Sequence, residues 1–438
     1  MTRPQGDGDG WWTTSPRPEW SNEPTQKIAP IAPPYVAGNQ APPAPVVPVQ
    51  VAPEPAAPPA AAAAKRESWA DVAKGVCILL VVMWHVIMKH YLQITWHLPV
   101  PLPGVWGTFG DQLLPLRMPV FFTISGMFAA NAARRSWKVT ARSRIAKFYY
   151  LYVLWFTVHT AVLSLVPNFD TLAARNVGDL IEQLTITPTN LWYLVALAVY
   201  FVIAKLTLKL PVAVVLVPAF ALSAIASAGL LAAPGNRGQM YQNLIFFLAG
   251  LRLKPLVERW ARTATLRMLL IGGGGYLVVM LVLGKIGAKE WFGVWPVVSA
   301  LAVVVGIAAA AQLQRWAAVG GLLSRLGQNT LPIYVMHMPL LALWHLALLK
   351  PFSAAGTGVQ FVLALFLPLV LTALLATACL TLRRGLEAVG AHWLFDLPSR
   401  KKKPAAPAPP GAPADAEKTA TIPAWGDNQA TIILPYVR

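Results

Sequence analysis

The sequence has few charged residues and few cysteines, and each shortage excludes a class of protein. Only 12% of its 438 residues are Asp, Glu, Lys or Arg, whereas 56% are hydrophobic. A soluble chain of this length needs a charged fraction of about 25%, so this composition indicates a polytopic membrane protein. The two cysteines, Cys77 and Cys379, both lie in apolar runs and predict neither a disulfide framework nor a metal site. No signal peptide is expected, because the first apolar run begins only near Ala70.

Acidic residues are scarcer than basic ones. The chain has 18 Asp and Glu against 36 Lys and Arg, which gives a formal net charge of +18. Such an excess can indicate nucleic-acid binding, but here the bases lie in short loops between apolar segments. That placement is typical of residues that set membrane topology, so we expect no nucleic-acid partner.

Long hydrophobic runs are what the sequence does have. We predict an all-α integral membrane protein of about ten transmembrane helices, with its membrane domain over residues 67–385. The runs of spanning length cover residues 70–91, 111–131, 146–166, 190–206, 211–232, 239–255, 266–285, 291–312, 328–349 and 358–382.

The loop charges predict the orientation of these helices. With the N-terminus inside, the basic stretches 134–147 and 252–267 fall in cytoplasmic loops, whereas the outer loops keep few bases. Both termini are then cytoplasmic, and we expect a multi-pass protein of a plasma membrane.

Both ends of the chain are rich in Pro and Ala. Residues 1–66 and 398–438 cannot bury a core, so we predict that both cytoplasmic tails are disordered. The basic cluster at 400–403 would rest on anionic headgroups of the lipid bilayer. The patterns TQKI at 25–28 and TATI at 419–422 are candidate sites for a phosphothreonine reader or an envelope-synthesis partner, although a solvated linker is the simpler interpretation.

The first apolar run carries four ionisable residues, Asp71, Lys74, His85 and Lys89. At 100° per helical residue they fall within roughly 60° of arc and form one polar stripe. Snorkelling to the interface can explain the three near the helix ends, but His85 lies well inside the run. Ionisable side chains at that depth usually face a bundle interior or a wet cavity, so the stripe predicts a functional cavity.

Arg117 is the second candidate for chemistry. If the second helix runs inward from about Asp111, Arg117 lies roughly two turns below the outer surface, at a depth similar to that of His85. An arginine there is costly unless it is satisfied. The alternative is a packing role, with Arg117 paired to a nearby acid or to helix-end carbonyls.

Four further residues are candidates in later helices. In NTLPIYVMHMPLL, residues 329–341, His337 follows Tyr334, and both are open as acid/base or acceptor contacts or as packing residues. Trp192 and Tyr193 fit an interfacial aromatic belt or the binding of a sugar acceptor. His159 is interpreted as a satisfied core histidine.

These residue types fit two kinds of function. A histidine whose ordinary pKa lies near neutrality can act as a general base, and an arginine at the same level can stabilise an oxyanion or bind a phosphate. Lys74, at the cytoplasmic mouth, suits the phosphates of a donor. The combination fits acyl transfer from a cytoplasmic thioester, but it also fits a proton-coupled transporter or flippase of an envelope lipid or sugar. Transporters often contain internal repeats, and no convincing repeat is present.

Two segments carry a family resemblance. DVAKGVCILLVVMWH at 71–85 and RMPVFFTISGMF at 117–128 resemble the opening motifs of the acyltransferase 3 family of bacterial envelope O-acyltransferases. LWYL at 191–194 and TLPIYVMH at 330–337 are similar to its later landmarks, so the resemblance spans about residues 68–384. It implies acyl-CoA, often acetyl-CoA, as donor and a hydroxyl of a carbohydrate or glycolipid as acceptor. It also implies a catalytic role for His85 and a supporting role for Arg117.

The resulting prediction is a membrane O-acyltransferase. His85 would deprotonate the acceptor hydroxyl, Arg117 would stabilise the tetrahedral oxyanion, and Lys74 with Arg142 or Arg144 would hold the donor phosphates. Transfer through an acyl-His85 intermediate stays open. We expect no bound cofactor: acyl-CoA is a co-substrate, and the acceptor is an envelope glycolipid or polysaccharide.

Overall fold

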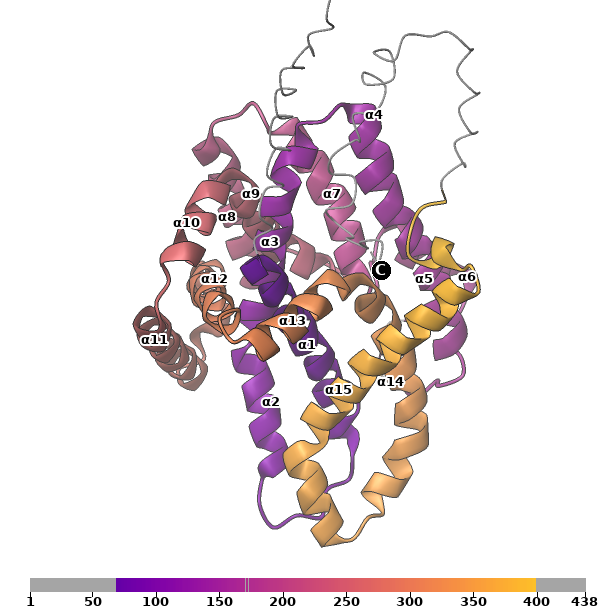
Figure 1. The fold of residues 1–438 in the computed structure, drawn as a ribbon. Coiled ribbons are helices and arrows are strands. Elements are labelled where there is room, and N and C mark those ends of the chain that lie inside the picture. Colours follow the sequence, from indigo (N-terminus) through magenta and orange to yellow (C-terminus); the bar gives the residue numbers. More distant parts are fainter. Residues whose placement is uncertain (1–67, 170, 172, 399–438) are drawn as a thin grey trace, which may run out of the picture. The chain divides into compact units, whose positions relative to one another are not determined.

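The computed structural model describes residues 68–169, 171 and 173–398, and the elements in this part of the chain are helices (Figure 1). The predictions for the tail at 1–66, the basic cluster at 400–403 and the two threonine patterns lie outside the described residues.

Each of the ten predicted segments coincides with a helix. They are α1 (Ser68–Lys89), α3 (Leu114–Ala133), α5 (Lys147–Leu163), α7 (Trp192–Leu206), α8 (Val212–Ser227), α9 (Arg237–Arg252), α11 (Leu266–Lys285), α12 (Val294–Leu313), α14 (Thr330–Ser353) and α15 (Thr357–Ala388).

Length and composition make six helical stretches of the described chain candidate membrane spans. The protein is therefore a multi-pass membrane protein, whereas membrane crossing by the remaining predicted segments and the cytoplasmic location of the termini stay predictions. The six stretches are Ser68–Gln93, Leu102–Ala133, Leu266–Lys285, Val294–Leu313, Thr330–Ser353 and Thr357–Ala388.

Several short elements were not expected from hydropathy. They are α2 (Leu102–Gln112), α4 (Trp137–Thr140), α6 (Val177–Thr185), α10 (Lys254–Thr263), α13 (Ala317–Gln328), the 3-10 turns η1 (Tyr91–Gln93), η3 (Ala288–Glu290) and η4 (His392–Leu394), and a π-helix, η2 (Ala141–Ala146).

The helix α2 lengthens the second candidate span toward the N-terminus. This stretch starts at Leu102 rather than near Asp111, and α2 joins α3 at Leu113, with Pro115 in the first turn of α3. The depth of Arg117 in the membrane stays a prediction.

The helix α1 packs very closely on α13. A Cβ atom built on Gly75 would lie 2.0 Å from the main-chain oxygen of Leu323, and one on Gly327 would lie 1.8 Å from that of Asp71. Only glycine permits this separation, because any side chain would overlap the backbone of the other helix. The glycine that follows Lys74 therefore fixes how α1 lies on α13.

A second glycine contact joins α3 to α9. A Cβ atom on Gly126 would lie 1.9 Å from the main-chain oxygen of Phe247, and one on Gly250 would lie 1.9 Å from that of Thr123. In the motif at 117–128, Gly126 therefore forms a helix contact, and the preceding Ser125 carries a polar side chain.

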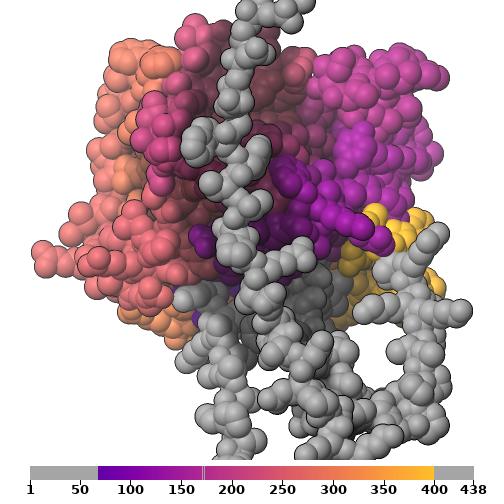
Figure 2. All heavy atoms as spheres, turned by 90° about the horizontal axis from the view of Figure 1, so that it is seen from above, coloured from indigo at the N-terminus to yellow at the C-terminus, as the bar shows by residue number. Residues whose placement is uncertain are grey.

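Figure 2 shows the first residues of α1, in indigo, near the centre of this view, with magenta and yellow segments to one side of them. An ion pair of 2.8 Å between Lys147 and Asp396 links the start of α5 to the residues that follow α15. In the predicted orientation these residues lie on the cytoplasmic face.

Candidate functional site

His85 is held in one tautomer by its own helix. Its Nδ1 atom lies 2.8 Å from the carbonyl oxygen of Val81, and because a carbonyl only accepts, Nδ1 must carry the hydrogen. Nε2 of the neutral ring then keeps its lone pair and can accept a proton. The ring packs against His337, with the two ring centres 5.0 Å apart.

His337, on α14, has the same arrangement. Its Nδ1 donates to the carbonyl oxygen of Ile333 over 3.0 Å, and its buried Nε2 has no hydrogen-bond partner among the described residues. The two histidines predicted as acid/base candidates therefore meet across the α1–α14 interface. In their neutral forms, both rings have an unprotonated Nε2 atom, and the ring centres are 5.0 Å apart.

Arg117 reaches this pair through Trp84. The guanidinium carbon of Arg117 lies 4.5 Å from the centre of the Trp84 ring, and the Trp84 ring meets His85 edge-on at 4.9 Å. This is a cation–π contact for a buried arginine. The structure thus groups Arg117 with His85, but an aromatic ring that the sequence analysis did not select lies between them.

A cavity lies beside this group, but His85, Arg117, His337 and Trp84 are not among its lining residues. One end carries Lys74 and Arg144, and the other is bounded by Val81 and Met118, the first a hydrogen-bond acceptor of His85 and the second the neighbour of Arg117. Lys74 and Val81 are seven residues apart, about 10 Å along α1. The full lining is Lys74, Ile78, Val81, Met118, Phe121, Ser125, Phe128, Ala129, Arg144, Phe148, Tyr193, Leu194, Leu197, Phe201, Thr330, Leu331 and Tyr334.

The basic end distinguishes the predicted phosphate ligands. Lys74 pairs with Asp71 at 2.9 Å and lies over the ring of Phe128. Arg144 is 4% exposed, whereas Arg142 is exposed and does not line the cavity. Both arginines lie in the π-helix η2, whose wider turn shifts the helical register and is frequent at functional sites.

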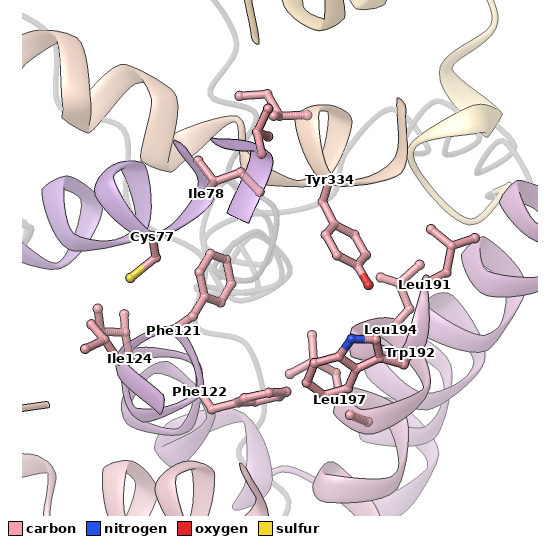
Figure 3. Close-up of a cluster of buried hydrophobic side chains, with 14 of the residues drawn as sticks. Cys77, Ile78, Phe121, Phe122, Ile124, Leu191, Trp192, Leu194, Leu197 and Tyr334 are labelled. Atoms are coloured by element: carbon pink, nitrogen blue, oxygen red, sulfur yellow. The ribbon is translucent and has the colours of Figure 1, made fainter. Parts of the chain in front are cut away.

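The tyrosines of the cavity wall are tied to one another. The Tyr193 hydroxyl lies 2.9 Å from that of Ser125, and the Tyr334 hydroxyl donates to the carbonyl oxygen of Asn190 over 2.8 Å. The Tyr334 oxygen also accepts the main-chain N–H of Tyr193 over 3.2 Å. Tyr334 therefore anchors the start of α7, and Figure 3 shows its hydroxyl pointing from α14 toward that helix.

Trp192 lies beside this wall. It is 7% exposed and packs on Phe122, with ring centres 5.7 Å apart, so it belongs to the buried aromatic cluster rather than to an exposed belt (Figure 3). Of the two predicted acceptor contacts, only Tyr193 lines the cavity.

A second histidine pair was not expected from the sequence. His90 and His345 are buried, and their Nδ1 atoms lie 3.2 Å apart. They follow His85 by five residues and His337 by eight, so a second imidazole pair lies farther along the α1–α14 interface.

His159 donates from Nε2 to the carbonyl oxygen of Val335 over 2.7 Å, which confirms it as a satisfied core histidine.

Within the described part of the chain, no group of three or more His, Cys, Asp or Glu side chains could hold a metal ion.

Comparison with known proteins defines the class. The chain belongs to the acyltransferase 3 family, whose model, an acyltransferase domain, matches residues 67–379. A curated relative is the inner membrane protein YcfT of Escherichia coli (strain K12), 28% identical over 358 residues, which is 76% of this chain and 97% of that protein. No solved structure matches the chain. The family and the apolar helices together support a multi-pass plasma-membrane protein of an acyltransferase family.

Proposed function

We propose that this protein is a membrane O-acyltransferase that moves an acyl group, expected to be acetyl, from cytoplasmic acyl-CoA to a hydroxyl of an envelope carbohydrate or glycolipid. The main support is the order of groups along the cavity, with two cations at one end and two imidazoles beyond the other. The groups of acyl-CoA follow the same order, because its phosphates and its thioester lie at opposite ends of an elongated molecule.

Donor binding follows from this match. Lys74 and Arg144 would contact the phosphates, and the apolar walls formed by Phe121 and Leu197 would surround the chain that carries the thioester. With the N-terminus inside, this basic end opens toward the cytoplasm.

The transfer step uses the imidazole pair. Nε2 of His85 takes the proton of the acceptor hydroxyl while the oxygen attacks the thioester carbonyl. Arg117 stabilises the oxyanion of the tetrahedral intermediate. Collapse of that intermediate breaks the C–S bond, and the leaving thiolate takes the proton from His85, so the base returns to its starting state.

The neighbouring His337 allows a second route. His85 could instead attack the thioester and carry the acyl group on Nε2, with Nε2 of His337 then acting as base for the acceptor. A pulse of labelled donor without acceptor separates the routes, since only the second leaves label on wild-type protein and none on His85→Ala.

The test is transfer of label from radiolabelled acetyl-CoA to an envelope-lipid extract by purified protein in liposomes. His85→Ala is expected to lower the rate by about 100-fold to 10,000-fold, as loss of a general base does. His392→Ala, which removes an exposed histidine outside the site, should leave the rate unchanged. Size-exclusion chromatography checks that each variant is folded.

Two results would overturn this proposal. Transfer that survives in well-folded His85→Ala protein would remove the catalytic assignment. Wild-type protein that does not bind acetyl-CoA at all would favour a proton-coupled transporter or flippase, in which the histidines relay protons.

A further inference from the structure

A second cavity lies at the other end of α3 from the Lys74–Arg144 end of the first. It lies among the α2–α3 junction, α11, η3 and the start of α12, which the predicted topology places toward the outer side. The lining combines two opposite charges and an indole with apolar side chains: Asp111, Leu114, Pro115, Met280, Leu283, Lys289, Val294, Trp295 and Val298.

A polar atom of the cavity wall has no partner. Among the described residues, the buried Nε1 atom of Trp295, which lines the cavity, makes no hydrogen bond. Buried polar groups in folded proteins are nearly always paired, so this indole N–H indicates a missing acceptor. Together with the Asp111 carboxylate and the Lys289 ammonium, it complements a molecule whose own hydroxyls both donate and accept.

The cavity lies close to the catalytic group. Asp111 lines it and directly follows Gly110. A Cβ atom on the adjacent Gly110 would lie 3.5 Å from Trp84, the ring that contacts both Arg117 and His85. A molecule bound here would approach His85 from a different side than a donor in the first cavity.

The surroundings are those of a bilayer interface. α11 exposes apolar side chains such as Leu277 and Leu281 and packs on α12 through Tyr276 and Met280. At the adjacent turn, Trp291 and Phe292 are each 61% exposed, as expected of aromatic residues at the membrane–water boundary. A hydrocarbon chain could therefore lie along α11 while its polar head occupies the cavity.

We propose that this cavity binds the hydroxylated headgroup of a lipid-linked acceptor, which enters sideways from the outer leaflet between α11 and α12. The inference rests on the proposed acyl transfer and gives its acceptor a chemical class, a polyhydroxylated head on a hydrocarbon anchor, and a binding site.

Occupancy is tested directly with a photoreactive alkyl glucoside in liposomes that contain the full-length His85→Ala variant. Adducts should map to residues 276–298 and be displaced by the unlabelled alkyl glucoside, but not by an alcohol of the same chain length. Equal displacement by the alcohol would reveal only an apolar lipid groove, and equal displacement by free glucose would remove the lipid anchor. Either result, or adducts confined to other helices, overturns the proposal.

Matched variants then test the polar contacts. Trp295→Phe keeps an aromatic, though smaller, ring and removes the N–H, so about five- to tenfold more alkyl glucoside should be needed for half-maximal displacement. Lys289→Gln should act in the same direction, whereas Trp291→Phe at the exposed turn should have no effect. Unchanged displacement in both Trp295→Phe and Lys289→Gln contradicts the proposed site.

Because this readout needs no catalysis, its failure is distinguishable from failure of the transferase proposal. If labelling depends on the headgroup but the wild-type protein transfers no acyl group, the proposed acceptor site stands and the proposed reaction is wrong. If the wild-type protein transfers acyl groups to the lipid extract but labelling does not depend on the headgroup, the reaction stands and the acceptor site is wrong.

Discussion

Replacing Gly75 with alanine should destabilise the protein through the α1–α13 contact. The new Cβ would lie 2.0 Å from the main-chain oxygen of Leu323, while ordinary contacts begin at 3.4 Å, so the helices must separate by more than 1 Å. Overpacking typically costs about 1–3 kcal/mol, and the upper end applies because a backbone atom cannot change rotamer. Alanine recovers about 1 kcal/mol of helix propensity. The net loss is therefore about 2 kcal/mol, or about 2–3 °C in Tm for a chain of this size.

The measurement is thermal unfolding of purified protein in one detergent, followed by the loss of the monodisperse size-exclusion peak. Gly321→Ala is the matched control, because Gly321 is exposed on α13 and no described atom lies within 4 Å of its Cβ position. This control should keep or slightly raise the Tm. Equal Tm values for Gly75→Ala and Gly321→Ala would refute the close approach of the two helices.

Three further predictions concern the proposed site. Arg144→Ala should raise the acetyl-CoA concentration for half-saturation at least about tenfold and Arg142→Ala less than about twofold, because only Arg144 lines the cavity; binding of labelled acetyl-CoA measures both, and equal effects would contradict the assignment. Tyr334→Phe should lower the free energy of unfolding by about 1–2 kcal/mol, since the hydroxyl bonds two main-chain groups at the start of α7; an unchanged melting curve would exclude this anchoring role. Trp84→Leu removes the ring beneath Arg117, a contact worth about 0.5–2 kcal/mol, and should reduce kcat about 2- to 30-fold, whereas Trp84→Phe should keep most of the rate; a Phe variant as slow as the Leu variant would show that the ring face is not what matters.

The long helices could be predicted because hydropathy reports the same physical property that places a helix in a membrane. All ten predicted segments are helical, and their boundaries agree within a few residues in most cases. The helix α13 was missed because it has only 12 residues and contains three glycines, so no apolar window of spanning length marks it. The early start of the second span was missed because α2 contains three glycines and a proline in addition to its apolar residues.

The site was predictable only along one helix at a time. A 100° wheel places Lys74 and His85 on one face, and the structure puts the first in the cavity wall and the second just beyond its far end. Which residues of other helices meet that face depends on tertiary packing, so Trp84 as the bridge to Arg117 and the partner of His90 could not be read from spacing. The difference between Arg142 and Arg144 likewise depends on a π-helix that the local sequence does not signal.

The two cavities suggest why such a site would lie inside a membrane. Carrying acyl-CoA across the bilayer would move several phosphate charges through hydrocarbon, and carrying a polyhydroxylated headgroup inward would strip its hydroxyls of water. The proposed arrangement avoids both, because the donor stays on the Lys74–Arg144 side and the acceptor head on the Asp111–Lys289 side. Only a small neutral acyl group then has to pass the layer formed by His85 and Trp84. Arg117 is buried beside that layer on the ring of Trp84, and an oxyanion that forms between the cavities would add the counter-charge that this ring does not supply.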